Sequence, residues 1–218
     1  MAASSAVRKG ALVTLEGIDG SGKSSLAQAL EEALKARGVD AVFTREPTRS
    51  WLGEAVKRAI REASDPFVEA FLFLADHADH VRQVQQWIAQ RKLVVSDRYG
   101  DSCLAYQAAT LDPVLRPRGV DALDWLAVAQ APVTRAPDLC LLLDLEPRAA
   151  LQRIAGREEL IKFEDQVFLE RVRSNYLRLA RSRPYVETLD AMLPHDKLLA
   201  AALDARARRH ALPSRDRP

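Results

Sequence analysis

Residues 17–24 hold the densest group of side chains that could do chemistry in this chain. They read Gly-Ile-Asp-Gly-Ser-Gly-Lys-Ser, which matches the pattern G-x-x-x-x-G-K-[ST] without a gap. In such a loop the glycines let main-chain N–H groups approach phosphate oxygens, and the next helix adds the positive end of its dipole. Lys23 is expected to reach the β- and γ-phosphates, and the Ser24 hydroxyl to bind Mg²⁺. The loop therefore predicts a nucleoside triphosphate site made of Gly17, Gly20, Ser21, Gly22, Lys23, Ser24 and Ser25.

The residues around this loop predict the elements that must position it. An apolar run at 11–16 precedes the loop, and apolar residues at helical spacing follow it over 22–37. Apolar strands then alternate with helices, which is typical of a parallel sheet covered on both faces. Strands are predicted at 11–16, 39–44, 93–96, 138–145 and 185–189. Helices are predicted at 22–37, 51–63, 67–90, 101–109, 120–130, 147–155, 166–181 and 194–208, with a Pro- and Arg-rich loop at 112–119.

The composition is that of a globular protein and limits the classes of partner. The 218 residues are 48% hydrophobic and 28% charged, and the net charge of +2 requires no nucleic-acid partner. We expect no membrane span, because no apolar run of about 18 residues occurs, and no signal peptide. Cys103 and Cys140 indicate neither a disulfide framework nor a zinc site. A cytoplasmic enzyme with small-molecule partners is the resulting prediction.

Three further segments lie in the order and spacing of one family. They are Thr44-Arg45-Glu46-Pro47, the sequence Phe-Leu-Ala-Asp at 73–76, and Asp-Arg-Tyr-Gly-Asp-Ser-Cys-Leu-Ala-Tyr-Gln at 97–107. Together with the phosphate-binding loop they resemble the thymidylate kinases, over residues 12 to about 191. The resemblance implies ATP-dependent phosphorylation of dTMP to dTDP, Mg²⁺ as cofactor and a homodimer. It also implies a P-loop nucleoside monophosphate kinase-like three-layer α/β fold, with a parallel sheet of about five strands flanked by helices and a short lid.

The length predicts one kinase domain. We expect this domain to span 11–205, with its lid at about 153–165. A flexible N-terminus at 1–10 is expected to precede it. The last segment, 206–218, holds five Arg and one Asp, and is expected to be a basic flexible tail.

The chemistry of Asp97 and Arg98 supports this comparison. Asp97 ends an apolar strand beside that of the loop, so its carboxylate can hold Mg²⁺ directly or through water. A helix-capping Asp is the alternative interpretation. Arg98 can meet phosphate with a fixed fork of donors, and in the family the matching Arg holds the acceptor phosphate. The alternative for Arg98 is a surface ion pair.

The resemblance also implies the residues that bind the acceptor. Asp19 matches a carboxylate that contacts the 3′-hydroxyl of the deoxyribose. Tyr106 matches an aromatic residue beneath the sugar that leaves no room for a 2′-hydroxyl, while core packing would equally explain a tyrosine. Phe73 matches the phenylalanine that stacks on thymine. Arg45 is expected to clamp the monophosphate, and Ser102 and Gln107 to line the base and sugar pocket.

Arg153 and Arg157 are predicted to place positive charge on the phosphoryl group in transfer, which such reactions require. Some thymidylate kinases supply this charge from an arginine inside the loop, but positions 18–21 contain none. The chain therefore resembles the type that uses lid arginines. Since the two residues are four apart, a basic helix face is the alternative interpretation.

His77 departs from the family pattern. The family usually has an arginine there, which reads the thymine carbonyl, whereas imidazole is shorter and its charge depends on pH. Cys103 also stands where a polar base contact often occurs. Two alternatives therefore stay open: a kinase of another or a broader range of (deoxy)pyrimidine nucleotides or nucleosides, and a non-catalytic nucleotide-binding module. The intact Lys23 and Asp97 argue against the second alternative.

Overall fold

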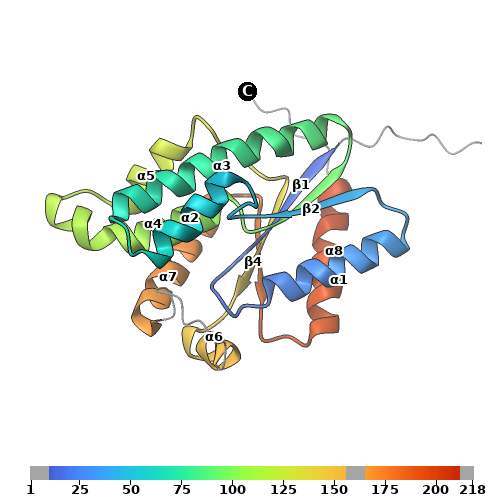
Figure 1. The fold of residues 1–218 in the computed structure, drawn as a ribbon. Coiled ribbons are helices and arrows are strands. Elements are labelled where there is room, and N and C mark those ends of the chain that lie inside the picture. The colour runs from blue at the N-terminus through green and yellow to red at the C-terminus, as the bar shows by residue number, and fades with distance from the viewer. Residues whose placement is uncertain (1–9, 156–164, 212–218) are drawn as a thin grey trace, which may run out of the picture.

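Five parallel strands form the central sheet of the protein (Figure 1). The structure is a computed structural model, and it describes residues 10–155 and 165–211. Their order across the sheet is β2-β3-β1-β4-β5. The inner strands are nearly continuous apolar runs and are buried, as expected where helices cover both faces of a parallel sheet. The strands are β1 (Ala11–Glu16), β2 (Ala41–Arg45), β3 (Leu93–Asp97), β4 (Leu139–Asp144) and β5 (Val186–Asp190).

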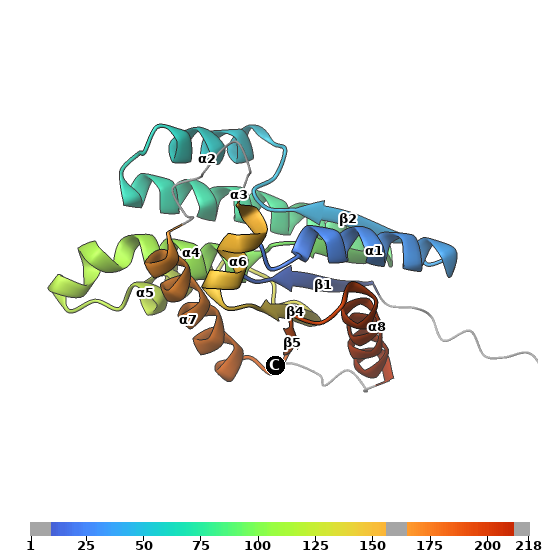
Figure 2. The same cartoon turned by 90° about the horizontal axis from the view of Figure 1, so that it is seen from below.

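Helices cover the sheet on both sides. Helices α1 and α8 contact one another on one side, while α3, α4 and α7 pack together on the other, and α2 and α5 lie outside them (Figures 1 and 2). The helices are α1 (Lys23–Ala36), α2 (Trp51–Arg61), α3 (Pro66–Ala89), α4 (Gly100–Leu115), α5 (Ala122–Gln130), α6 (Pro147–Ile154), α7 (Gln166–Ser182) and α8 (His195–Ala211). A short 3₁₀ turn, Arg116–Arg118, follows α4. The predicted three-layer α/β fold is confirmed.

Strand register brings the predicted functional segments to one edge of the sheet. Leu15 of β1 and Arg45 of β2 both pair with Asp97 of β3, so the carboxyl ends of three strands lie side by side. The phosphate-binding loop leaves β1 at this edge. Loops at the carboxyl ends of parallel strands are the usual place for ligands in such sheets.

One loop prediction is wrong. The segment 112–119 was expected to be irregular, but α4 continues through Pro113 to Leu115 before the 3₁₀ turn. Leu111 and Leu115 are buried in an apolar cluster between α3, α4 and α5. Their burial offsets the hydrogen bond that proline cannot donate.

Helix α8 extends beyond the predicted domain boundary at residue 205. It continues to Ala211, so the first part of the predicted tail is helical. Arg208 forms an ion pair with Glu187 of β5, and Arg209 donates to the carbonyl of Pro184. Residues 212–218 and 1–9 lie outside the described residues.

Both cysteines are free and buried. Burial raises the pKa of the Cys103 and Cys140 thiols above their usual range, and nearby carboxylates act in the same direction. Both side chains are therefore held as thiols in the interior. Among the described helices, none is long and apolar enough to cross a membrane.

Candidate active site

The loop between β1 and α1 turns through three glycines with positive φ, Gly17, Gly20 and Gly22. At Gly17 and Gly20 a side chain would also collide with the backbone, because a Cβ atom would lie 2.6 Å from the carbonyl oxygens of Leu143 and Ala150. Only glycine satisfies both the turn and this close approach. The loop thus reaches the start of α1 with Ser24 and Ser25 exposed. The turn has the backbone conformation that the sequence predicts for a phosphate-binding loop.

The Lys23 side chain contacts other residues of this loop. Its Nζ donates to the carbonyl of Ile18 at 2.8 Å and to the Ser21 hydroxyl at 3.4 Å. Burial lowers the pKa of Lys23 to about 7, and the positive charge of Arg98 acts in the same direction. Phosphate oxygens in the loop would supply the negative charge that keeps this ammonium protonated.

Ser24 and Asp97 meet across the neighbouring strands, where the Ser24 hydroxyl donates to Asp97 Oδ2 at 2.7 Å. A hydroxyl and a carboxylate are the hard oxygen ligands that Mg²⁺ prefers, with the remaining positions left to phosphate oxygens and water. Within 10–155 and 165–211, no group of three or more His, Cys, Asp or Glu side chains could hold a metal by itself. The two residues therefore fit a Mg²⁺ ion that arrives with the nucleotide.

Arg98, Asp19 and Tyr106 form one cluster beside the loop. The Arg98 guanidinium forms an ion pair with Asp19, and its carbon lies 4.9 Å from the centre of the Tyr106 ring. Tyr106 donates to Asp19 Oδ2 at 2.8 Å and accepts from the Asp19 N–H at 2.9 Å. Burial alone would raise the pKa of Asp19, but the charge of Arg98 outweighs it and holds that pKa below its usual value. The structure brings these three predicted residues together.

The Arg98 backbone adopts an unusual conformation, with φ at 71°. This left-handed region costs a non-glycine residue about 1–2 kcal/mol. The Arg98 N–H donates to the carbonyl of Leu15 at 2.9 Å, and the Arg98 carbonyl accepts from the Ser96 hydroxyl at 2.6 Å. These contacts direct the guanidinium toward the loop, where Nη1 donates to Ser102 at 3.2 Å and to the Gly17 carbonyl at 3.4 Å.

Glu16 is a buried carboxylate that the sequence interpretation missed. It accepts from the Tyr99 N–H at 2.9 Å, from the Ser102 hydroxyl, and from the Tyr176 hydroxyl at 3.2 Å. Burial raises the pKa of Glu16 to about 7, against the hydrogen bond from Ser102 and the charge of Arg98. An acidic residue that ends a buried apolar strand was the available signal.

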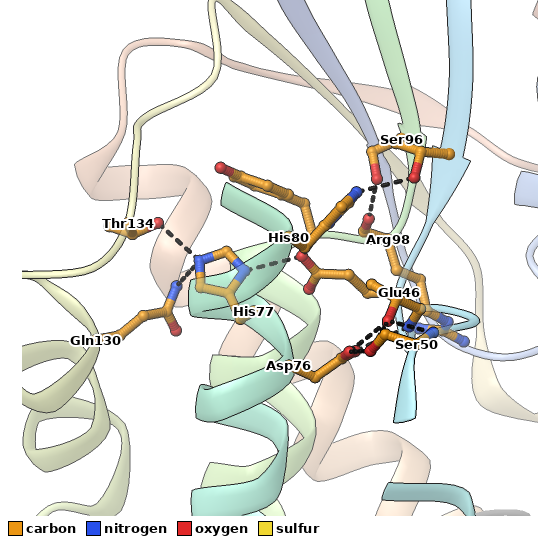
Figure 3. A network of polar contacts seen from close by, with 12 residues as sticks. Glu46, Ser50, Asp76, His77, His80, Ser96, Arg98, Gln130 and Thr134 are labelled. Carbon is orange, nitrogen blue, oxygen red and sulfur yellow. Dashed lines mark hydrogen bonds and ion pairs between the residues drawn. The ribbon is translucent and has the colours of Figure 1, made fainter. Parts of the chain in front are cut away.

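His77 lies on α3 in a second network, beside Glu46 of the segment that follows β2 (Figure 3). Its side chain is fully buried; Nδ1 lies 2.9 Å from Glu46 Oε1 and Nε2 lies 2.9 Å from the Thr134 hydroxyl. His80 contacts the same Glu46 oxygen at 2.7 Å and the Thr44 hydroxyl at 2.8 Å. Both ring nitrogens of His77 are therefore used inside the protein. The contact between His77 and a base stays a prediction, and it would compete with these internal partners.

The carboxylate of Glu46 joins the two imidazoles. Burial alone would raise the pKa of Glu46, but the charge of His77 and the hydrogen bonds from both histidines hold it at about 2. Next to it, Asp76 accepts from the Thr48 N–H at 2.8 Å and from the Ser50 hydroxyl at 3.3 Å (Figure 3). Ser50 also caps α2. Helix α3 thereby fixes the segment that follows Arg45.

The remaining predicted residues take different positions. Arg45 is exposed at the end of β2, and Phe73 is half-buried on α3. Gln107 is fully buried on α4, and neither of its amide atoms has a hydrogen-bond partner within the described chain. Arg153, at the end of α6, is exposed and donates to the Gly20 carbonyl at 3.5 Å and the Ala191 carbonyl at 3.0 Å. Arg157 and most of the predicted lid lie outside the described residues.

A small cavity of about 50 Å³ lies behind Tyr99, between the start of α4 and the loop before β4. Buried polar atoms without a described partner line it, namely Tyr99 Oη, Gln130 Oε1 and Arg135 Nε. A polar space of this size with several unsatisfied groups suits ordered water. No residue of the phosphate-binding loop lines the cavity, and Gln130, which does, contacts His77 Nε2 at 3.4 Å.

Comparisons with known proteins agree with this arrangement. A family model described as thymidylate kinase matches residues 15–201. The chain is similar to the probable thymidylate kinase of Methanococcoides burtonii, with 45% identity over 177 residues, 81% of this chain and 85% of that protein. The probable thymidylate kinase of Methanosarcina mazei is 44% identical over 193 residues (87% and 92%). That of Methanoculleus marisnigri is 43% identical over 209 residues (95% and 98%).

Proposed function

The chain belongs to the thymidylate kinase family, and from this premise we propose that it transfers the γ-phosphoryl group of ATP to dTMP to give dTDP. The main support for this proposal is that two groups of polar side chains lie close together at the carboxyl edge of the sheet. Lys23 and the Ser24–Asp97 pair form the donor side, and Arg98 with Asp19 and Tyr106 forms the acceptor side. A phosphoryl group between them can pass in line from one phosphate to the other.

On the donor side, we propose that the loop amides and Lys23 bind the triphosphate. The positive-φ glycines let main-chain N–H groups approach phosphate oxygens, and the start of α1 adds its dipole. Bound Mg²⁺, held by Ser24 and Asp97 with phosphate oxygens, would neutralise charge on the phosphates. The exposed Arg153 lies beside the Gly20 carbonyl, close enough to place its charge on the transferring group, and Arg157 is proposed to do the same.

On the acceptor side, we propose that Arg98 binds the phosphate of dTMP. Its guanidinium already projects toward the loop and can exchange part of its contact with Asp19 for phosphate oxygens. Asp19 and Tyr106 then face the sugar, where Asp19 accepts from the 3′-hydroxyl. Because the acceptor is an anion, the reaction needs no strong base and depends on positioning and charge neutralisation.

For the rest of the acceptor site we propose the roles that the family implies. Arg45 helps to clamp the monophosphate, Phe73 stacks on thymine, and Ser102 and Gln107 line the pocket. The unpartnered amide of Gln107 supports its assignment, since a buried amide without partners is costly unless a ligand satisfies it.

We also propose a homodimer that works in the cytoplasm. Val68 and Phe71 are exposed on α3, and Phe71 packs against Trp125 of α5, so an apolar surface is available to a second copy. The free, buried cysteines suit a reducing compartment. Light scattering after size-exclusion chromatography tests the dimer.

A coupled ATP-consumption assay with a panel of nucleoside monophosphates tests the function. We expect dTMP to give the highest kcat/KM, above dUMP and dCMP, and chelation of Mg²⁺ with EDTA to abolish turnover. ADP formation that is independent of any monophosphate, or a clear preference for another acceptor, would contradict the proposal.

A further inference from the structure

Glu16, at the end of β1, connects three segments beside the cluster of Arg98, Asp19 and Tyr106. It is the last residue of β1 and fully buried, and its carboxylate receives three hydrogen bonds. The donors are the Tyr99 N–H, the Ser102 hydroxyl on α4 and the Tyr176 hydroxyl on α7. Ser102 and Tyr176 also lie 2.8 Å apart. The carboxylate is therefore the centre of a closed polar cluster.

This cluster holds Arg98 from two sides. The Tyr99 N–H belongs to the peptide unit that follows Arg98, so Glu16 fixes the backbone immediately after the left-handed residue. Ser102 accepts from Arg98 Nη1 while its own hydrogen is directed to Glu16. The orientation of the Ser102 hydroxyl, and with it one contact of the guanidinium, depends on the acceptor at position 16.

A carboxylate at this position is costly for the fold. Among the described residues no cation forms an ion pair with Glu16, so its charge is balanced by hydrogen bonds and by the more distant Arg98 and Lys23. Taking a carboxylate out of water without a paired cation is unfavourable, and a neutral amide of the same shape would avoid that cost. A group that costs stability at the centre of an active site points to a functional role.

We infer that Glu16 is a positioning residue for the acceptor phosphate, acting on Arg98 through the Tyr99 N–H and the Ser102 hydroxyl. The inference rests on the proposed phosphoryl transfer to dTMP. It assigns Glu16 no contact with either nucleotide. Tyr176, which completes the cluster from α7, is a weaker member of the same unit.

The variant Glu16→Gln tests the inference, because the amide keeps the shape and the acceptor for Tyr99 but presents a donor to Ser102. Ser102 must then turn its hydrogen away and accept from the amide, in competition with Arg98. We expect the KM for dTMP to rise about tenfold or more, while the KM for ATP changes less than about twofold. We also expect the Tm of the free protein at pH 8 to rise by about 2 °C or more.

These readouts separate positioning from charge and from folding. Neutralising Glu16 raises the local positive potential, which favours a phosphate, so weaker dTMP binding reports lost positioning. Tyr176→Phe should raise the KM for dTMP in the same direction by a smaller factor. Asp138→Asn is the matched control, since Asp138 accepts from the Leu12 N–H at the other end of β1 and should leave both KM values unchanged.

An unchanged KM for dTMP in Glu16→Gln, or parallel losses of stability and of both nucleotide affinities, would overturn the inference. The wild-type assay keeps this outcome distinct from failure of the proposed function. If the wild type does not phosphorylate dTMP, the function fails whatever the variant does. If it does, only the variant decides the role of Glu16.

Discussion

At the scale of single residues, the carboxyl of Glu16 and the ammonium of Lys23 are both buried near the loop. The pKa of Glu16 is raised to about 7 and that of Lys23 is lowered to about 7, in both cases chiefly by burial. The free site thus holds ionisable groups whose charged forms are poorly solvated. Nucleotide phosphates would stabilise the ammonium of Lys23, so substrate binding and protonation are coupled.

Lys23→Ala should lower kcat/KM for dTMP at least about 100-fold, because the loop loses the only side-chain cation that it contains. Steady-state kinetics with purified variants measures the loss. Lys57→Ala, on the exposed face of α2, removes a lysine that contacts only Glu54 among the described ion pairs and should leave kcat/KM unchanged. Turnover by Lys23→Ala within about twofold of the wild type would show that this ammonium does not act on the phosphates.

The raised pKa of Glu16 also predicts how stability depends on pH. Since the folded pKa (about 7) lies above the ordinary glutamate value of 4.5, the folded state binds this proton more tightly than the unfolded chain. The resulting stabilisation is fully present below about pH 4.5 and is lost as the pH rises through about 7. Its size is on the order of 3 kcal/mol.

Denaturant unfolding of the free wild type and Glu16→Gln at several pH values measures this effect. The stability of the variant relative to the wild type should increase between pH 4.5 and pH 8, since only the wild type has a carboxyl to ionise there. Lys23 titrates in both proteins, so its contribution to the pH dependence largely cancels when their unfolding free energies are subtracted. A difference that is independent of pH would mean that Glu16 keeps one charge state throughout.

At the scale of elements, the sequence predicted most helices and strands, apart from the end of α4, but not every contact between segments. The loop, its strand and its helix follow from local spacing, as does the position of Asp97 at the end of β3. Asp19, Arg98 and Tyr106, which the resemblance assigned to the acceptor site, contact one another. Asp19 and Arg98 follow the ends of the neighbouring strands β1 and β3, so the sheet topology brings them together, while Tyr106 reaches them from α4.

Contacts between distant segments account for what was missed. His77 stands where the family has a base-reading arginine, and the sequence did not show its contact with Glu46, which comes from the segment after β2. Pro113 predicted a loop because local chemistry disfavours proline in helices, whereas packing of Leu111 and Leu115 maintains α4. The sequence showed Glu16 only as the end of a strand, because its side-chain partners come from the distant helices α4 and α7.

The buried position of His77 predicts the effect of replacing it with the arginine typical of the family. A Cβ on Gly100 would already lie 3.0 Å from the His77 ring, so a longer guanidinium has no space there. We expect His77→Arg to destabilise the protein by about 3 kcal/mol or more, through the broken network and the crowding around it. Denaturant unfolding measures the change.

Asp79→Arg is the matched control for His77→Arg, because Asp79 lies on the same helix, is 44% exposed and pairs only with Arg82 among the described ion pairs. Its effect on stability should be small. If His77→Arg folds with wild-type stability and raises the preference for dTMP over dUMP and dCMP, position 77 reaches the base after all.

At the scale of the whole molecule, α8 closes the face of the sheet that α1 covers. Ala202 and Ala205 are buried, and Arg208 and Arg209 extend the contact to β5 and to the segment before it. A chain ended after Asp204 should therefore lose at least about 2–4 °C in Tm. Thermal unfolding of this truncation is compared with a chain ended after Ala211, which should match the full-length protein. Equal Tm values for both truncations would mean that the last turns of α8 contribute no stability.

The two buried thiols have a practical consequence for following motion in this enzyme. Maleimide dyes react with exposed thiolates, and Cys103 and Cys140 are neither exposed nor readily ionised. A cysteine placed at an exposed position, such as Trp51 on α2 or Val167 on α7, would then be the preferred labelling site without removal of the native pair. Fluorescent pairs at these positions could report the distance between the two helices as nucleotides bind and leave.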